Sequence, residues 1–153
     1  MISVSKETLI VGLRKRRNKM EVKLFVNVSN HPMKEWSQEQ LKAATVLGED
    51  GTFEVQFPQV GPEWSKVDIR LESVRIYDLI LSGISAWMHS HPLSANLYSP
   101  KVTVHLMGEQ SLFFFLANFL LDKGFSVVVS TTERKTKANF QFVKFRELSR
   151  PLK

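Results

Sequence analysis

The stretch "VKLFVNVSNHPMKEWSQEQLKAA", residues 22–44, decides the fold class because a strand pattern runs directly into a helix pattern. Its first seven residues, Val22–Val28, are mostly apolar and include three β-branched valines, as in a buried strand. Ser37 is a helix-capping residue, and Gln40 three positions later predicts a capping box. Gly48 predicts the end of this helix. The stretch therefore predicts the first strand–helix unit of an α/β protein.

The same alternation continues along the chain. Further strands are predicted at 53–60, 101–107, 125–130 and 140–148, and further helices at 67–84 and 111–123. The last two strands are consecutive, and residues 131–139 between them predict a polar turn. The fold class expected from this order is an α/β, Rossmann-like sandwich with a mostly parallel sheet and a C-terminal antiparallel hairpin. Residues 85–100 are rich in turn formers and predict a loop insertion.

Composition and charge indicate one domain with a basic N-terminal arm. The chain has 153 residues, 43% of them hydrophobic, which is enough for a packed core. Its net charge is +6, but residues 1–20 hold six Lys or Arg and one acidic residue. Residues 21–153 are thus a nearly neutral domain, which favours a small-ligand site over a surface for duplex nucleic acid. The arm is a candidate RNA contact, and its other interpretation is a solvated tail.

Several classes of protein are disfavoured by what the sequence lacks. It has no Cys, which excludes disulfides and thiolate chemistry. Its longest apolar run, residues 111–121, is shorter than the roughly 18 residues of a membrane span. In residues 1–20 the charges follow the apolar part, the reverse of a secretory signal. We therefore expect a cytoplasmic protein with no membrane association.

Polar residues follow each predicted parallel strand, and in a doubly wound sheet ligands bind beyond those strand ends. The candidate ligand-binding residues are Asn30, His31, Trp36, Gly108, Glu109, Gln110, Ser130, Thr131, Thr132 and Arg134. Because parallel strands end at the same edge of a sheet, these groups are expected to converge.

Each group also has an ordinary structural explanation. His31 can shuttle a proton, but residues 30–32 also suit a strand end and a helix cap. Trp36 can stack on a base, although a Trp at a helix start is often core. Glu109 can act as a base or favour the helix dipole. Residues 130–134 combine hydroxyls with a guanidinium, which suits phosphate, but they also suit a polar turn.

Three histidines raise the question of a metal site. They are His89, His91 and His105, and the first two flank a Ser in the sequence HSH. No carboxylate completes a recognisable ligand spacing around them. The sequence therefore predicts no metal and no other cofactor.

The segments "LFVNVSNHPMKEWSQEQLKAA", "FPQV", "VHLMGEQSLFFFLANFLLDKGFSVVVSTTER" and "FVKFREL" resemble a family of small CRISPR-associated proteins with a Rossmann-like fold. These proteins are similar to the CARF sensor domains of type III CRISPR systems. The resemblance implies a homodimer that binds cyclic oligoadenylate, and in ring-nuclease relatives metal-free cleavage by ribose 2′-OH attack. It implies that His31 or Glu109 aids proton transfer and that Arg134 neutralises the phosphate.

Three functions follow as hypotheses. The first is binding of cyclic oligoadenylate or a related nucleotide, with ring cleavage as an added activity. The second is a non-enzymatic interaction subunit of a defence complex, using the Phe-rich helix and the Trp-containing insertion as its interface. The third is a nucleotide or sugar-phosphate enzyme of another kind, because a fold does not fix a function.

Overall fold

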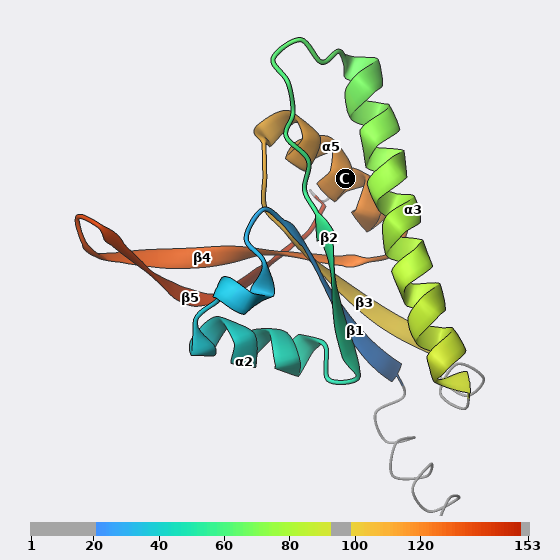
Figure 1. Cartoon of the computed structure of the whole chain (residues 1–153), viewed down its shortest axis with the longest axis horizontal. Helices are drawn as coiled ribbons and strands as arrows, with labels where there is room; N and C mark the ends of the chain where they lie inside the picture. Colours follow the sequence, from blue (N-terminus) through green and yellow to red (C-terminus); the bar gives the residue numbers. More distant parts are fainter. Residues whose placement is uncertain (1–20, 93–98, 151–153) are drawn as a thin grey trace, which may run out of the picture.

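A computed structural model describes residues 21–92 and 99–150 of the chain as one five-stranded sheet covered by helices (Figure 1). The elements are β1 (Glu21–Ser29), the 3₁₀ helix η1 (Met33–Glu35), α2 (Gln38–Leu47), β2 (Gly51–Gln56), α3 (Lys66–Ser90), β3 (Ser99–Leu106), α5 (Gln110–Asp122), β4 (Ser126–Thr136) and β5 (Asn139–Leu148). The predicted basic arm, residues 1–20, and the centre of the predicted insertion, residues 93–98, lie outside the described residues.

The strand order is β2-β1-β3-β4-β5, with the first four strands parallel and β5 antiparallel to β4. The predicted α/β class, the mostly parallel sheet and the C-terminal hairpin are therefore confirmed. From β1 the chain moves outward to β2 and then crosses back to β3. The order thus reverses between β1 and β3, which is the point where doubly wound sheets bind ligands.

The helices cover the two faces of the sheet unequally, and each face has its own core. On one face α3 and α5 pack on the sheet, in a core that includes Leu24 and Val26 of β1 and Ile80 of α3, all fully buried. On the other face α2 covers a smaller cluster built around Phe25 and Trp36. Alternate residues of β1 thus enter opposite cores. This explains why β1 is an almost continuous apolar run.

The predicted loop at residues 85–100 is wrong at both ends. Helix α3 continues to Ser90, and β3 already begins at Ser99. The Trp87 indole, near the end of α3, donates a hydrogen bond of 3.2 Å to the carbonyl of Asp50 and stacks on His91. Tertiary contacts of this kind hold a helical turn together even where the local sequence favours a loop.

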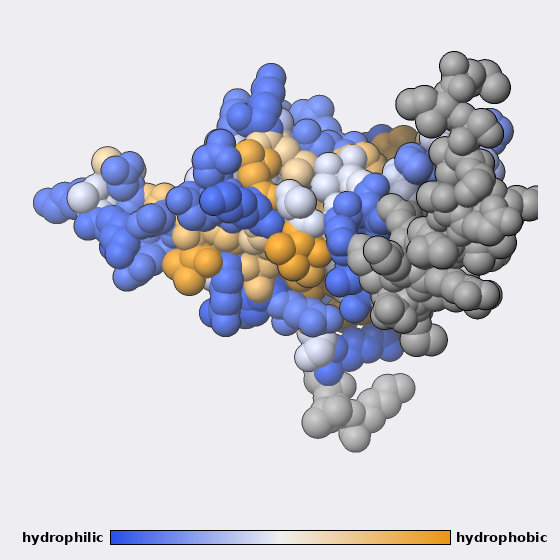
Figure 2. Space-filling model, turned by 90° about the horizontal axis from the view of Figure 1, so that it is seen from below, coloured by the Kyte–Doolittle hydropathy of each residue, from blue (hydrophilic) through white to orange (hydrophobic). Residues whose placement is uncertain are grey.

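The predicted polar turn at residues 131–139 is also wrong. Strand β4 extends to Thr136 and β5 begins at Asn139, so most of this segment is paired strand. The two strands run beyond the core as a hairpin arm (Figure 1), and its outer part, at the left of Figure 2, is mostly hydrophilic. A two-stranded arm with both faces in water needs no apolar alternation, and for this reason the sequence pattern resembled a turn.

Gly48, directly after α2, provides a test of the packing between α2 and β1. A Cβ atom on Gly48 would lie 2.5 Å from Phe25 Cβ and 2.9 Å from the Phe25 nitrogen, and backbone of β1 has little room to move. We expect Gly48→Ala to lower the free energy of unfolding by about 1–3 kcal/mol, measured by urea denaturation. Gly61→Ala is the control, because its Cβ would meet the Glu63 carboxylate, the end of a flexible side chain. Equal effects of the two substitutions would contradict this packing.

Candidate functional site

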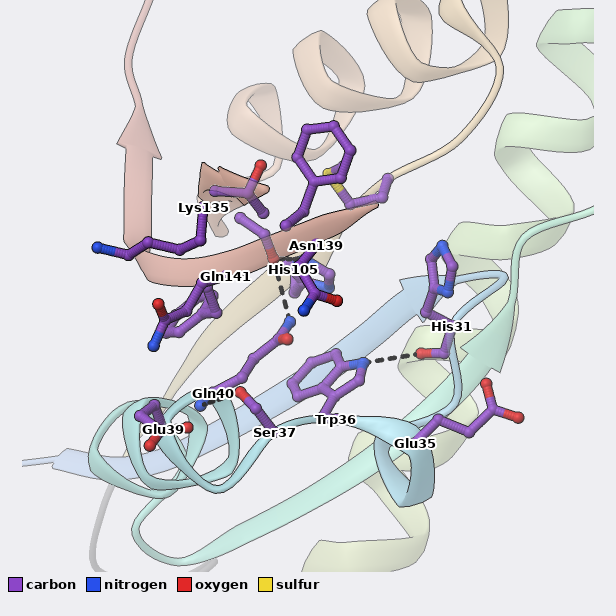
Figure 3. Close-up of a pocket in the computed structure, with 15 residues that line it drawn as sticks. His31, Glu35, Trp36, Ser37, Glu39, Gln40, His105, Lys135, Asn139 and Gln141 are labelled. Atoms are coloured by element: carbon purple, nitrogen blue, oxygen red, sulfur yellow. Dashed lines mark hydrogen bonds between the residues drawn. The ribbon is translucent and has the colours of Figure 1, made fainter. Parts of the chain in front are cut away.

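A cavity of about 850 Å³ opens at the carboxyl edge of the sheet, on the face that α2 covers (Figure 3). Its volume lies within the range of about 300–1,000 Å³ that is typical of small-ligand sites. Its walls come from the β1–α2 connection, the start of α2, the ends of β3 and β4, and the hairpin arm. The lining residues are His31, Glu35, Trp36, Ser37, Glu39, Gln40, His105, Met107, Ser130, Thr132, Lys135, Asn139, Phe140, Gln141 and Phe142.

A row of polar side chains crosses the sheet beneath this cavity. Asn27 in β1 is paired in register with Glu54 in β2 on one side and His105 in β3 on the other. The Asn27 amide nitrogen donates to Glu54 Oε2 and to the carbonyl of His31, each at 2.9 Å. Both of these partners accept only. The orientation of the Asn27 amide is therefore fixed, with its oxygen turned to His105.

The hydrogen bonds of His105 follow from that orientation. Its Nδ1 lies 2.9 Å from Asn27 Oδ1, so Nδ1 carries the proton and donates. Its Nε2 lies 2.7 Å from Ser130 Oγ, and in the neutral imidazole this nitrogen accepts from the hydroxyl. Ser130 Oγ in turn accepts a hydrogen bond of 3.2 Å from the Gln40 side chain. The hydroxyl proton of Ser130 is thus directed at His105.

Burial keeps His105 neutral. Only 2% of the residue is exposed, and its ring stacks 6.3 Å from Phe25 and meets the edge of Trp36 at 5.1 Å. Burial lowers the pKa of His105 to about 4, and the nearby His31 adds a smaller effect in the same direction. At neutral pH the base of the cavity therefore presents an uncharged imidazole.

In the β1–α2 joint, residues 30–37, backbone groups hold the turn of the chain, and side chains line the cavity. The carbonyl of His31 accepts hydrogen bonds from Asn27 and from the Trp36 indole, the latter at 3.0 Å, and so turns the chain. The His31 side chain is exposed and lines the cavity. Trp36 is 9% exposed: it belongs to the α2 core and also forms part of the cavity wall (Figure 3).

Gln40 is where the predicted capping box fails. Ser37 caps α2 as expected, since its hydroxyl accepts from the Gln40 backbone N–H at 3.2 Å. The Gln40 side chain, however, reaches across to Ser130 instead of back to the cap. The start of α2 is thereby tied to β4 across the cavity.

The structure brings four of the ten sequence-predicted ligand-binding residues to this cavity. They are His31, Trp36, Ser130 and Thr132. Asn30 borders a smaller hollow beside β2. Thr131 bonds the backbone of Lys144 through its hydroxyl, at 2.9 Å to the carbonyl oxygen.

Arg134 lies farther out on the hairpin arm. Its guanidinium donates to the Lys137 carbonyl at 2.8 Å and lies 5.5 Å from the centre of the Phe140 ring. It therefore follows the arm and does not line the cavity wall.

The predicted group Gly108, Glu109 and Gln110 serves the start of α5. The Glu109 carboxylate accepts from the backbone N–H groups of Ser111 and Leu112, each at 3.0 Å, and these bonds lower its pKa. A Cβ on Gly108 would lie 2.2 Å from the Phe57 ring, so close packing explains this glycine. Of the three predicted catalytic residues, His31 lines the cavity, whereas Glu109 and Arg134 do not.

Three residues at the centre of the site are not among the ten sequence-predicted ligand-binding residues. His105, Asn27 and Gln40 form its network, and Lys135, Asn139, Phe140, Gln141 and Phe142 form its outer wall. The available signal was the presence of Asn27 and His105 inside strands that are otherwise buried and apolar, because a buried polar side chain needs a partner. The outer wall gave no such signal, since residues 131–139 predicted a turn and residues 140–148 an ordinary strand.

Two further findings concern site types considered from the sequence. Among residues 21–92 and 99–150, no three His, Asp or Glu side chains gather closely enough to hold a metal ion. In the same described segments, no helix combines the length and the hydropathy needed to cross a membrane.

The fold and the cavity define the class: an α/β protein with a ligand-sized cavity at the switch point of a doubly wound sheet. The family model described as "Uncharacterized protein MJ1673 family" matches residues 23–146, and the chain belongs to this family. The match begins in β1 and ends in β5, so it spans every residue that lines the cavity. Neither the curated proteins nor the solved structures contain a match.

The neutral state of His105 predicts a specific loss of stability in acid. Its folded pKa is lowered to about 4 from an ordinary 6.5, so the unfolded chain binds the proton more readily. The folded protein therefore keeps its full free energy of unfolding above pH 6.5. As the pH falls from 6.5 toward 4, protonation of His105 in the unfolded chain lowers that free energy. The loss amounts to on the order of 3 kcal/mol.

Chemical denaturation between pH 7 and pH 4 measures this effect. In His105→Gln the pH dependence should be weaker than in the native chain by that amount. His89→Gln, which changes an exposed residue on α3, should keep the native slope. Parallel slopes for native protein and His105→Gln would show that His105 does not titrate as described.

Proposed function

We propose that this protein binds a nucleotide in the cavity at the carboxyl edge of its sheet. One observation carries the proposal: aromatic side chains, side-chain amides and one lysine line the same cavity. Trp36 comes from the β1–α2 connection, and Phe140 and Phe142 come from β5. Aromatic side chains of this kind stack on bases. The amides of Asn139 and Gln141 offer donors and acceptors for a base edge (Figure 3).

The charges around the cavity favour a ligand that places one phosphate group in each cavity. Lys135 provides the ammonium group for a phosphate, while Glu35 and Glu39 contribute carboxylates. Carboxylates accept hydrogen bonds from ribose hydroxyls and from the exocyclic amine of adenine. His105, at the base of the cavity, adds no charge because it is neutral. This balance suits one nucleotide unit per cavity better than a polyphosphate.

Cyclic oligoadenylate is the particular ligand that we propose. The sequence resemblance to CARF-like proteins supports it, and so does a cavity that suits adenine with one phosphate. In this proposal two copies of the chain form a homodimer, and each cavity takes part of the ring. Ring cleavage would use no metal, with the ribose 2′-OH attacking the adjacent phosphate and His31, at the cavity wall, assisting proton transfer.

Phe140→Ala tests the aromatic wall. Phe140 is 67% exposed, so its removal should hardly change the melting temperature but should remove a stacking surface. We expect a loss of binding free energy of about 1–3 kcal/mol, read by calorimetry with cyclic tri-, tetra- and hexa-adenylate and with AMP. Phe114→Ala, at a site that is 71% exposed on α5 and outside the cavity, is the matched control.

The outcomes distinguish binding of the ring, binding of a nucleotide in general, and no nucleotide site. Binding of a ring that Phe140→Ala weakens and Phe114→Ala does not supports both ligand and cavity, and chromatography of the bound ring then reports cleavage. Binding of AMP alone would retain the nucleotide site and reject the ring. No affinity for any of these ligands would overturn the proposal.

A second candidate function, an interaction subunit, is favoured by exposed apolar residues on the opposite side of the sheet. Val67 and Leu71 on α3 and Phe114 on α5 are 62%, 64% and 71% exposed. Phe114 also lines a groove between the starts of these helices. Trp87 does not contribute, because its indole is turned toward Asp50. A hetero-complex that Phe114→Glu disrupts while nucleotide affinity stays unchanged would favour this function.

A further inference from the structure

A hydroxyl, an imidazole and an amide lie in one hydrogen-bonded line at the base of the cavity. Ser130 Oγ is 2.7 Å from His105 Nε2, and His105 Nδ1 is 2.9 Å from Asn27 Oδ1. We propose that Ser130 is a nucleophile for acyl transfer, with His105 as its general base and Asn27 as the residue that positions the imidazole. This activity goes beyond nucleotide binding and does not depend on it.

The directions of the hydrogen bonds are those that a serine nucleophile requires. Because the Asn27 amide nitrogen faces the two acceptors Glu54 and His31, its oxygen must face His105. The proton of His105 is then on Nδ1, and its Nε2 lone pair points at the hydroxyl of Ser130. The same arrangement of nucleophile, base and orienting group recurs in acyl-transfer enzymes on unrelated folds.

Exposure to the cavity increases from Asn27 through His105 to Ser130, as expected if Ser130 is the residue that meets a substrate. Asn27 is 1% exposed and His105 is 2% exposed, while Ser130 is only partly buried and lines the cavity. The reacting oxygen is therefore the member of the line that a ligand reaches first. A purely structural partner for His105 would have no need to open onto a cavity of this size.

The acyl-transfer step needs no reagent beyond the ester and water. Ser130 Oγ attacks the carbonyl carbon, and its proton passes to His105 Nε2 as the new C–O bond forms. The tetrahedral intermediate expels the alcohol or phenol, which takes that proton from His105, and acyl-Ser130 remains. Water, deprotonated by His105, then releases the acid and restores the hydroxyl.

Gln40 is placed to stabilise the developing negative charge. Its Nε2 lies 3.2 Å from Ser130 Oγ, where it donates to the attacking oxygen. A primary amide has a second N–H hydrogen, which remains for the carbonyl oxygen of the substrate. Donors fixed beside the reacting atoms before the reaction are a main source of transition-state stabilisation.

The substrate class follows from the weakness of the base. His105 is buried, and its partner Asn27 is a neutral amide, so the imidazolium formed in the reaction gains no carboxylate neighbour there. Esters and thioesters with good leaving groups place the smallest demand on such a base. Phosphoryl groups are less suitable, because Lys135 is the one Lys or Arg among the lining residues and its ammonium lies 3.4 Å from Glu133 Oε2. The aromatic wall favours flat acyl or aryl groups.

Labelling of the whole chain with a fluorophosphonate tests this assignment. Ser130 Oγ would attack phosphorus, fluoride would leave with the proton, and mass spectrometry would locate the adduct. We expect the adduct on Ser130 and a burst of nitrophenol from p-nitrophenyl acetate. Ser130→Ala should remove both, whereas Ser82→Ala, at an exposed serine on α3, should change neither.

Asn27 is tested through the tautomer of His105. Nitrogen-15 spectra of the native protein should show the His105 proton on Nδ1. In Asn27→Ala a mixture of tautomers should appear, and the labelling rate should fall roughly tenfold or more. A purely structural Asn27 would alter stability but leave the labelling rate of the folded protein unchanged, and that result would reject its positioning role.

Other outcomes decide between the two proposals. Labelling of Ser130 in a protein without nucleotide affinity would leave this inference standing and reject the nucleotide site. No adduct on native Ser130, or an adduct on other serines at the same rate, would overturn the nucleophile whatever the nucleotide measurements show. Because the adduct is mapped in the native chain, this result does not depend on how any variant folds.

Discussion

The buried side chain of Asn27 is the contact on which the arrangement of the site depends. It donates to Glu54 and to the His31 carbonyl, and it accepts from Ser29 and His105. These bonds join β2, β1, the β1–α2 joint and β3 at one point that is 1% exposed. A buried donor or acceptor left without a partner costs about 1–3 kcal/mol. Satisfying all four together therefore selects one register for three strands.

The polar row also explains how one sheet can have a packed core and a reactive edge. In β1, residues that face α3 and α5 are apolar throughout, while on the other face Phe25 is followed by Asn27 and Ser29. A shift of one residue in the strand register would place the side chains of Asn27 and Ser29 in the larger core, which is apolar and offers them no hydrogen-bond partners. The same pattern that fixes the register delivers the polar groups to the carboxyl edge.

Helix α2 shows how much of this the sequence reveals. Ser37 and Gly48 mark its ends, and both were recognised because capping is a local interaction between neighbours in the chain. The partner of Gln40 was missed because Ser130 is 90 residues away, and only the folded sheet brings them together. The partners of His105 were missed for a related reason, and it was considered as a metal ligand instead. The alternation of a strand shows which face of the sheet a side chain lies on, but it does not show which side chain of another strand it contacts. Local signals thus predicted the fold class and the C-terminal hairpin, whereas the site depends on pairing across strands.

The two walls of the cavity differ in how firmly they are held, which bears on any ligand between them. The inner wall, with Trp36 and His105, belongs to a packed core. The outer wall, with Phe140 and Phe142, is carried by a hairpin arm whose far end extends beyond that core (Figure 1). A two-stranded ribbon alone is only marginally stable in water. A ligand that contacts both walls would tie the arm to the core and stabilise the bound arrangement by mass action. Affinity would then depend on the arm, and chemistry on the rigid row beneath it.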